Sequence, residues 1–282
     1  MTVSFSPNPV TDLQLLFQYH FMQNAFLAGT VVAVMAGVIG YFVVLRRLAF
    51  ATEALSHGGF AGATGAVLIG QDVFVGMLTF TTLAGILMGV LGDRLRGRDV
   101  AIGATLAFSL ALGSLFLTMS TRLAGEAVNI LFGNILAISP ADVRLVTLFA
   151  CLSLAVMGVI YRPLLFASLD PEIAEARGLP VRGLSVGFMV LLGCAVATAV
   201  QIVGVLLIFA LLILPAATAQ QLTARPPHAI MLSVAIGVAC VWLGLIIGFY
   251  VPYPPSFFIT TLSFVGYLAV SRRSFAFAPA AN

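Results

Sequence analysis

The sequence predicts an all-α polytopic membrane protein with about nine transmembrane helices, or eight if one apolar segment is re-entrant. Of the 282 residues, 61% are hydrophobic and only 8% are charged, and the mean hydropathy is +1.13. A soluble domain carries roughly 25% charged residues, so this chain has too few charges to cover a soluble surface. Its three cysteines are too few for a disulfide scaffold. Little length is left for a separate soluble domain.

Arginine supplies all 13 basic residues, and lysine is absent. A P-loop needs a lysine on the nucleotide phosphates, and Schiff-base chemistry needs a lysine amine, so neither is predicted. The sequence also contains no H-E-x-x-H motif and no CxxC pair. We therefore expect a chain that is not an enzyme and has no ATPase site of its own.

The first half of the chain alternates apolar runs with short polar breaks. Residues 1–20 are mildly polar and carry no arginine, so they predict an extracytoplasmic segment rather than a signal peptide. Arg46 and Arg47 end the first apolar run, and an arginine-rich loop at 93–99 precedes the fourth. Residues 120–142 are less hydrophobic and predict an interfacial or re-entrant segment before the fifth run. The candidate spans are 21–45, 49–70, 73–92, 101–119 and 143–161.

The most polar stretch of the chain, residues 169–183, predicts a short helix of two turns between two spans. Asp170 is a good N-cap, and Pro171 suits the first helical turn. Gly178 and Pro180 then stop the helix. Its charged residues favour a solvated surface, and its apolar members favour docking of a partner: Ile173, Ala174 and Ala176.

The apolar stretch 184–222 is 39 residues long, which is too long for one span. We expect two spans that turn near residues 201–204, with Pro215 breaking the second. The eighth and ninth spans are predicted at 229–250 and 257–270.

The arginines predict the orientation. With the amino terminus outside and nine spans, 11 of the 13 arginines fall on the cytoplasmic side, and only Arg122 and Arg144 fall outside. This topology gives one transmembrane domain at 21–271 and a cytoplasmic tail at 272–282. The cytoplasmic arginines are residues 46, 47, 94, 96, 98, 162, 177, 182, 225, 272 and 273.

Glu53 and His57 are the sharpest chemical signal. They lie four residues apart, so on a helix they share one face. An acid inside a span costs about 2.5–3.5 kcal/mol on insertion scales, and such residues usually line a path or a site. A carboxylate oxygen with an imidazole nitrogen suits a divalent transition metal. The alternative is that Glu53 lies near the cytoplasmic interface and pairs with an arginine, while His57 donates one structural hydrogen bond.

The remaining candidates carry weaker signals. Gly85-xxx-Gly89 and Gly244-xxx-Gly248 predict close helix packing, whereas the glycines around the pair could also open space beside it. His20 and His228 are expected to be solvated, because both lie outside the spans. The cysteines lie in apolar runs and are expected to behave as small hydrophobic residues. The glycines around the pair are residues 58, 59, 62 and 65, and the cysteines are residues 151, 194 and 240.

Four segments, in order, resemble the permeases of zinc/manganese/iron-type ABC importers, and the resemblance spans about residues 21–270. They are LRRLAFATEALSHGGFAGATGAVLIG (45–70), LFGNILAISPADV (131–143), DPEIAEARGLPVRG (170–183) and VGVLLIFALLILPAATAQQL (203–222).

The resemblance implies a multi-pass permease of the bacterial plasma membrane, surrounded by lipid. It implies two permease copies, expected to be a homodimer, a cytoplasmic ATPase under each and an extracytoplasmic metal-binding protein. It implies no tightly bound cofactor and no nucleic acid; the cargo is a divalent metal, Zn²⁺, Mn²⁺ or Fe²⁺. The 170–183 segment matches the coupling helix that docks in the ATPase, and its expected coupling residues are Asp170, Glu172, Ala176, Gly178 and Arg182.

In the family, an aspartate and a histidine four apart are thought to line the ion path, and here the pair is Glu53 and His57. The side chain of Glu53 is one methylene longer than that of the aspartate in the family. Some zinc-type relatives carry a further histidine in a later span, where this chain has Phe108. Two alternatives stay open: a permease for a metal chelate or cobalamin, in which the pair is dispensable, and an ion-coupled secondary transporter, which leaves the 170–183 segment unexplained.

Overall fold

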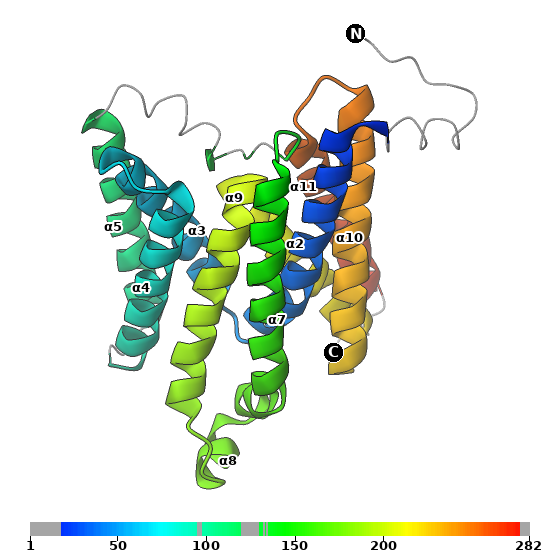
Figure 1. The fold of residues 1–282 in the computed structure, drawn as a ribbon. Helices are drawn as coiled ribbons and strands as arrows, with labels where there is room; N and C mark the ends of the chain where they lie inside the picture. The colour runs from blue at the N-terminus through cyan, green and yellow to red at the C-terminus, as the bar shows by residue number, and fades with distance from the viewer. Residues whose placement is uncertain (1–17, 95–97, 120–129, 132, 134, 277–282) are drawn as a thin grey trace.

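The computed structural model describes residues 18–94, 98–119, 130–131, 133 and 135–276 (Figure 1). The expected all-α class is confirmed, since no strand occurs among these residues. Residues 1–17 of the predicted amino-terminal segment, most of the predicted interfacial segment and the end of the predicted tail lie outside them. The helices are α2 (His20–Leu45), α3 (Ala49–Leu68), α4 (Val73–Arg94), α5 (Arg98–Met119), α7 (Pro140–Leu169), α8 (Pro171–Ala176), α9 (Val181–Leu222), α10 (Pro226–Tyr250) and α11 (Pro255–Ala276).

Within the described part of the chain, six helices are long and apolar enough to cross a membrane. The chain is therefore a multi-pass membrane protein, while the count of nine crossings and the amino-out orientation stay predictions. Two other long helices are not among these six. One is α11, and the other is α3, whose hydropathy is lowered by Glu53, His57 and its glycines. The six helices are α2, α4, α5, α7, α9 and α10.

Helix α9 is the central element of the fold. Figure 1 shows α3, α4 and α5 grouped on one side of it and α2, α10 and α11 on the other, and α9 contacts α2, α3, α4, α7, α10 and α11. Most of its side chains are buried. Both groups of helices are thus held together through α9.

Gly204 breaks α9 where the sequence predicted a turn. Its φ of 80° and ψ of 166° are not helical, and only glycine adopts them readily. The break is buried, and Gly133 packs against Val203 and Gly204 there. Irregular backbone is tolerated inside a membrane when protein covers it, so this cover makes the break possible.

The predicted break at Pro215 is wrong, because α9 continues through Pro215 to Leu222. A proline removes one backbone hydrogen bond, but the φ to which its ring is locked is itself helical, and packing can hold such a helix together. Pro215 is buried in α9, where neighbouring helices supply that packing. Helix α7 likewise runs through Pro163 and is longer than the predicted fifth span. It begins at a capping box in which Ser139 and Asp142 satisfy each other's backbone N–H groups.

Glycines let α9 and α4 approach closely. A Cβ on Gly85 would lie 2.7 Å from the Met189 carbonyl oxygen, and one on Gly193 would lie 2.7 Å from the Thr81 carbonyl oxygen. Gly244 and Gly248 pack in the same way against α11. The expectation that Gly85-xxx-Gly89 and Gly244-xxx-Gly248 serve close packing is confirmed.

We predict that Gly193→Ala destabilises the protein by about 1–3 kcal/mol, because the obstructing Thr81 carbonyl is backbone and cannot turn aside. The matched control is Gly187→Ala on the same helix, where no atom lies within 4 Å of the added Cβ. That variant should be neutral or more stable by up to about 1 kcal/mol. Unfolding equilibria in mixed micelles measure both. Equal effects for the two variants would contradict the close α4–α9 contact.

Candidate functional site

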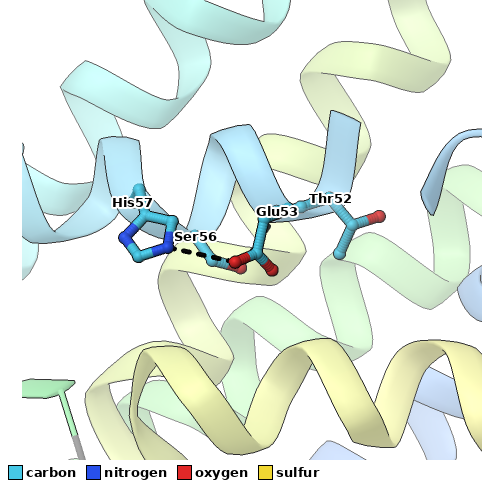
Figure 2. Close-up of polar contacts among 4 residues, drawn as sticks. All are labelled: Thr52, Glu53, Ser56 and His57. Atoms are coloured by element: carbon cyan, nitrogen blue, oxygen red, sulfur yellow. Dashed lines mark hydrogen bonds and ion pairs between the residues drawn. The ribbon is translucent and has the colours of Figure 1, made fainter. Parts of the chain in front are cut away.

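Glu53 and His57 lie on one face of α3, one turn apart (Figure 2). The distance from His57 Nε2 to Glu53 Oε1 is 3.1 Å. The side chain of His57 is 17% exposed and that of Glu53 is 31% exposed. Most of the rest of α3 is buried. Among the described residues, the ion-pair partner of Glu53 is His57 rather than an arginine.

The other ring nitrogen of His57 has no hydrogen-bond partner in the part of the chain that the structure describes. His57 Nδ1 is buried and makes no hydrogen bond to any described residue. If Nε2 carries the proton and donates it to Glu53, Nδ1 presents a bare lone pair. If instead both Nε2 and Oε1 bind one ion, their 3.1 Å separation fits two ligands that each lie about 2.1 Å from it. Only the second arrangement, with Nε2 unprotonated, lets the imidazole and the carboxylate bind one cation together.

The described chain offers few further metal ligands besides Glu53 and His57. No group of three or more His, Cys, Asp or Glu side chains gathers in that part of the molecule. The hydroxyls of Thr52 and Ser56 flank the pair in Figure 2, but both donate hydrogen bonds to carbonyls of their own helix. One chain therefore offers one carboxylate and one imidazole.

Glu53 opens onto a cavity of about 320 Å³ between α3 and the part of α9 beyond Gly204. Its other lining residues are Ala49, Phe50, Leu206 and Phe209. The sequence analysis missed Leu206 and Phe209, and the only local signal for them is the turn at Gly204. By contrast, Gly58, Gly59, Gly62 and Gly65 pack against neighbouring helices, so the structure does not support the idea that they open space.

The remaining histidines and cysteines lie elsewhere. His20 and His228 are exposed, as expected. Cys151 is exposed, Cys240 is buried and Cys194 lies 3.7 Å from the Thr82 hydroxyl. Phe108 lines an apolar cavity with Phe80 and Thr105.

The second candidate site is α8, which Figure 1 shows at one end of the bundle, between α7 and α9. Its predicted boundaries are confirmed. The Asp170 side chain accepts a hydrogen bond of 3.1 Å from the Ile173 backbone N–H, and Gly178 ends the segment with a φ of 79°. Arg177 lies over the Phe166 ring, 5.4 Å from its centroid, which fixes α8 against the end of α7.

The outer surface of α8 mixes charged and apolar side chains. Glu172, Ala176, Gly178 and Arg182 are exposed, and Asp170 is half-buried as the cap. Ile173 is 48% exposed and the adjoining Leu169 is 63% exposed. Ala174, which the sequence placed on the docking face, is instead fully buried, because it is the residue by which α8 packs onto the bundle.

Comparison with known proteins gives concordant results. Residues 18–274 match the ABC 3 transport family. The manganese import system permease protein ScaB of Streptococcus gordonii is 36% identical over 238 residues, covering 84% of this chain and 85% of that protein. The manganese transport system membrane protein MntC of Listeria innocua is 35% identical over 234 residues, 83% of each chain. A solved structure of PsaBC from Streptococcus pneumoniae in complex with Fab is similar over 96% of both chains, with a TM-score of 0.83 and 33% identity.

We predict that Asp170→Ala loosens α8, because the Ile173 amide loses its acceptor. An N-cap loss of about 1 kcal/mol corresponds to roughly fivefold faster local opening. Hydrogen–deuterium exchange over residues 171–177 measures this change. Glu175→Ala is the control, since the Glu175 side chain is exposed and the substitution keeps the backbone carbonyl that accepts from Gly178 N–H. Unchanged exchange in Asp170→Ala, or equal acceleration in the control, would contradict the capping role.

Proposed function

The chain belongs to the ABC 3 transport family, and from this premise we propose that it is the permease subunit of a plasma-membrane ABC importer for a divalent transition metal, with manganese as the cargo. The similarity to manganese permeases over more than four fifths of the chain supports this choice of ion. Glu53 and His57 are proposed as the ligands on the transport path.

The observation that carries the proposal is the Glu53–His57 pair. An ion on a transport path must lose part of its hydration shell without being held too tightly to leave. One carboxylate and one imidazole, 3.1 Å apart and beside a cavity, meet both requirements. Oxygen and nitrogen ligands of this kind are shared by Mn²⁺, Zn²⁺ and Fe²⁺.

A second copy of the chain completes the ligand set in this proposal. Two ligands leave most of an ion's coordination positions open, whereas a two-fold homodimer presents four. The surface around Glu53 is suited to such a contact, because Phe50 is 72% exposed and Leu206 is 50% exposed. Leu206 also lines an adjoining apolar cavity of about 690 Å³ with Tyr253 and Phe257. We propose that this face meets the partner copy at the ion path.

In this proposal, a separate ATPase subunit supplies the energy for transport. The chain contains no lysine, so it cannot form a Walker A site. We propose that a cytoplasmic ATPase docks on α8 and that its closure on ATP moves α8, giving alternating access. An extracytoplasmic binding protein would deliver the ion, and the permease itself needs no tightly bound cofactor.

We predict that His57→Ala and Glu53→Gln each lower manganese uptake by at least about tenfold, a loss typical even of outer-shell partners of a metal. Glu53→Asp should retain uptake, because it keeps the carboxylate and matches the family pattern. The control is His228→Ala, since His228 is exposed and distant from the pair in the chain. Uptake of radioactive manganese and zinc in cells expressing the whole transporter measures each effect.

Normal uptake in both His57→Ala and Glu53→Gln would contradict the ligand assignment. A wild-type complex that assembles and hydrolyses ATP but moves neither metal would favour a chelate or cobalamin cargo. Preferential accumulation of zinc over manganese would show that zinc, and not manganese, is the cargo.

We also predict that Ile173→Ser weakens binding of the ATPase subunit by about tenfold, because an apolar side chain is lost from the docking face. Leu222→Ser is the matched control: Leu222 is 53% exposed, close to the 48% of Ile173, but lies at the end of α9. Co-purification at graded detergent and salt concentrations measures both. Equal loss of the ATPase in the two variants would argue against α8 as the docking element.

A further inference from the structure

Arg46 connects the α2–α3 junction to both ends of α8. Its Nη1 donates a hydrogen bond of 3.3 Å to Ser168 Oγ, in the last turn of α7 before α8. Its Nη2 donates one of 2.6 Å to Ser185 Oγ, in the first turns of α9 after α8. One guanidinium thus bridges the two segments from which α8 projects.

The contacts around this bridge are well formed. The Ser168 hydroxyl donates to the Leu164 carbonyl, which leaves its oxygen lone pairs for Arg46. The guanidinium carbon lies 5.7 Å from the centroid of the Phe188 ring, within the range of a cation–π contact. Phe188 in turn packs against Phe42, one turn before Arg46 on α2. A planar group with several fixed donors suits such a bridge better than an ammonium would.

Arg46 also lies at the junction between α2 and α3. It caps the carboxyl end of α2, and Arg47 then turns the chain with a φ of 56°, a left-handed conformation. The next residue, Leu48, is fully buried, so the start of α3 is fixed against the bundle. Glu53 follows Arg46 by seven residues and lies on the second turn of α3.

We propose that Arg46 is the positioning residue that couples α8 to the Glu53–His57 pair. A displacement of α8 moves Ser168 and Ser185, and the guanidinium passes that displacement to the first turns of α3. The inference rests on the proposed function, in which the ATPase moves α8 and the Glu53–His57 pair binds the ion. It assigns the connection between them to one side chain.

The test compares two neighbouring arginines in the complete transporter, reconstituted in liposomes with its ATPase and the manganese-loaded binding protein. Arg46→Gln removes the bridge. Arg47→Gln makes the same change of charge and size at an exposed residue and is the control. The readout is manganese taken up per ATP hydrolysed, a ratio that a loss of folded complex does not change. Arg46→Gln should lower this ratio at least about threefold, in the range of measured coupling energies, whereas Arg47→Gln should keep it near wild type.

A second variant covers the case in which Arg46→Gln does not assemble. Ser168→Ala combined with Ser185→Ala removes both acceptors but keeps the guanidinium on Phe188, and it should lower the same ratio. An unchanged ratio in this double variant, or an equal fall in Arg47→Gln, would overturn the inference. If the wild-type complex takes up no manganese, the proposed function fails and the inference fails with it. If the wild type transports and the bridge variants keep its ratio, only the inference fails.

Discussion

Every backbone N–H and C=O group in a hydrocarbon layer must find its partner within the protein, and the rest of this structure depends on that constraint. It makes long helices the only available elements and makes any departure from a helix costly. Within the described part of α9, the chain departs from the helix at Gly204, which is buried and against which Gly133 packs. That break redirects α9 so that Leu206 and Phe209 face the start of α3. The cavity at Glu53 is a consequence of this turn.

The Glu53–His57 pair shows the same constraint applied to side chains. A lone carboxylate in an apolar bundle would be costly, and the nearby imidazole at 3.1 Å offsets part of that cost. The compensation is incomplete, because His57 Nδ1 has no protein partner among the described residues. Buried polar groups without partners are uncommon, and each one needs an explanation. In the proposed function, this position is kept for the ion, and the pair must both tolerate folding and bind a cation.

Local contacts hold the short helix α8 in place at the end of the bundle. A helix of six residues has little stability of its own, so its cap at Asp170, the buried Ala174 and the Arg177–Phe166 contact hold it in place. Arg46 then links both flanks of α8 to the helix that carries the pair. In the proposed function, α8 and the Glu53–His57 pair are therefore connected through contiguous contacts of Arg46.

Features that follow from neighbouring residues can be predicted from the sequence alone: the membrane class from composition, α8 from Asp170, Pro171 and Gly178, the shared face of Glu53 and His57 from their spacing, and the break in α9 from length and glycine. Features that depend on residues far apart in the chain cannot. Pro215 stays helical because other helices surround it, Ala174 faces inward because α8 packs on the bundle, and Ser168 and Ser185 meet Arg46 across more than 120 residues. The reason is physical: caps, turns and helical faces are set within one or two turns of chain, whereas burial and long-range hydrogen bonds depend on how the helices assemble.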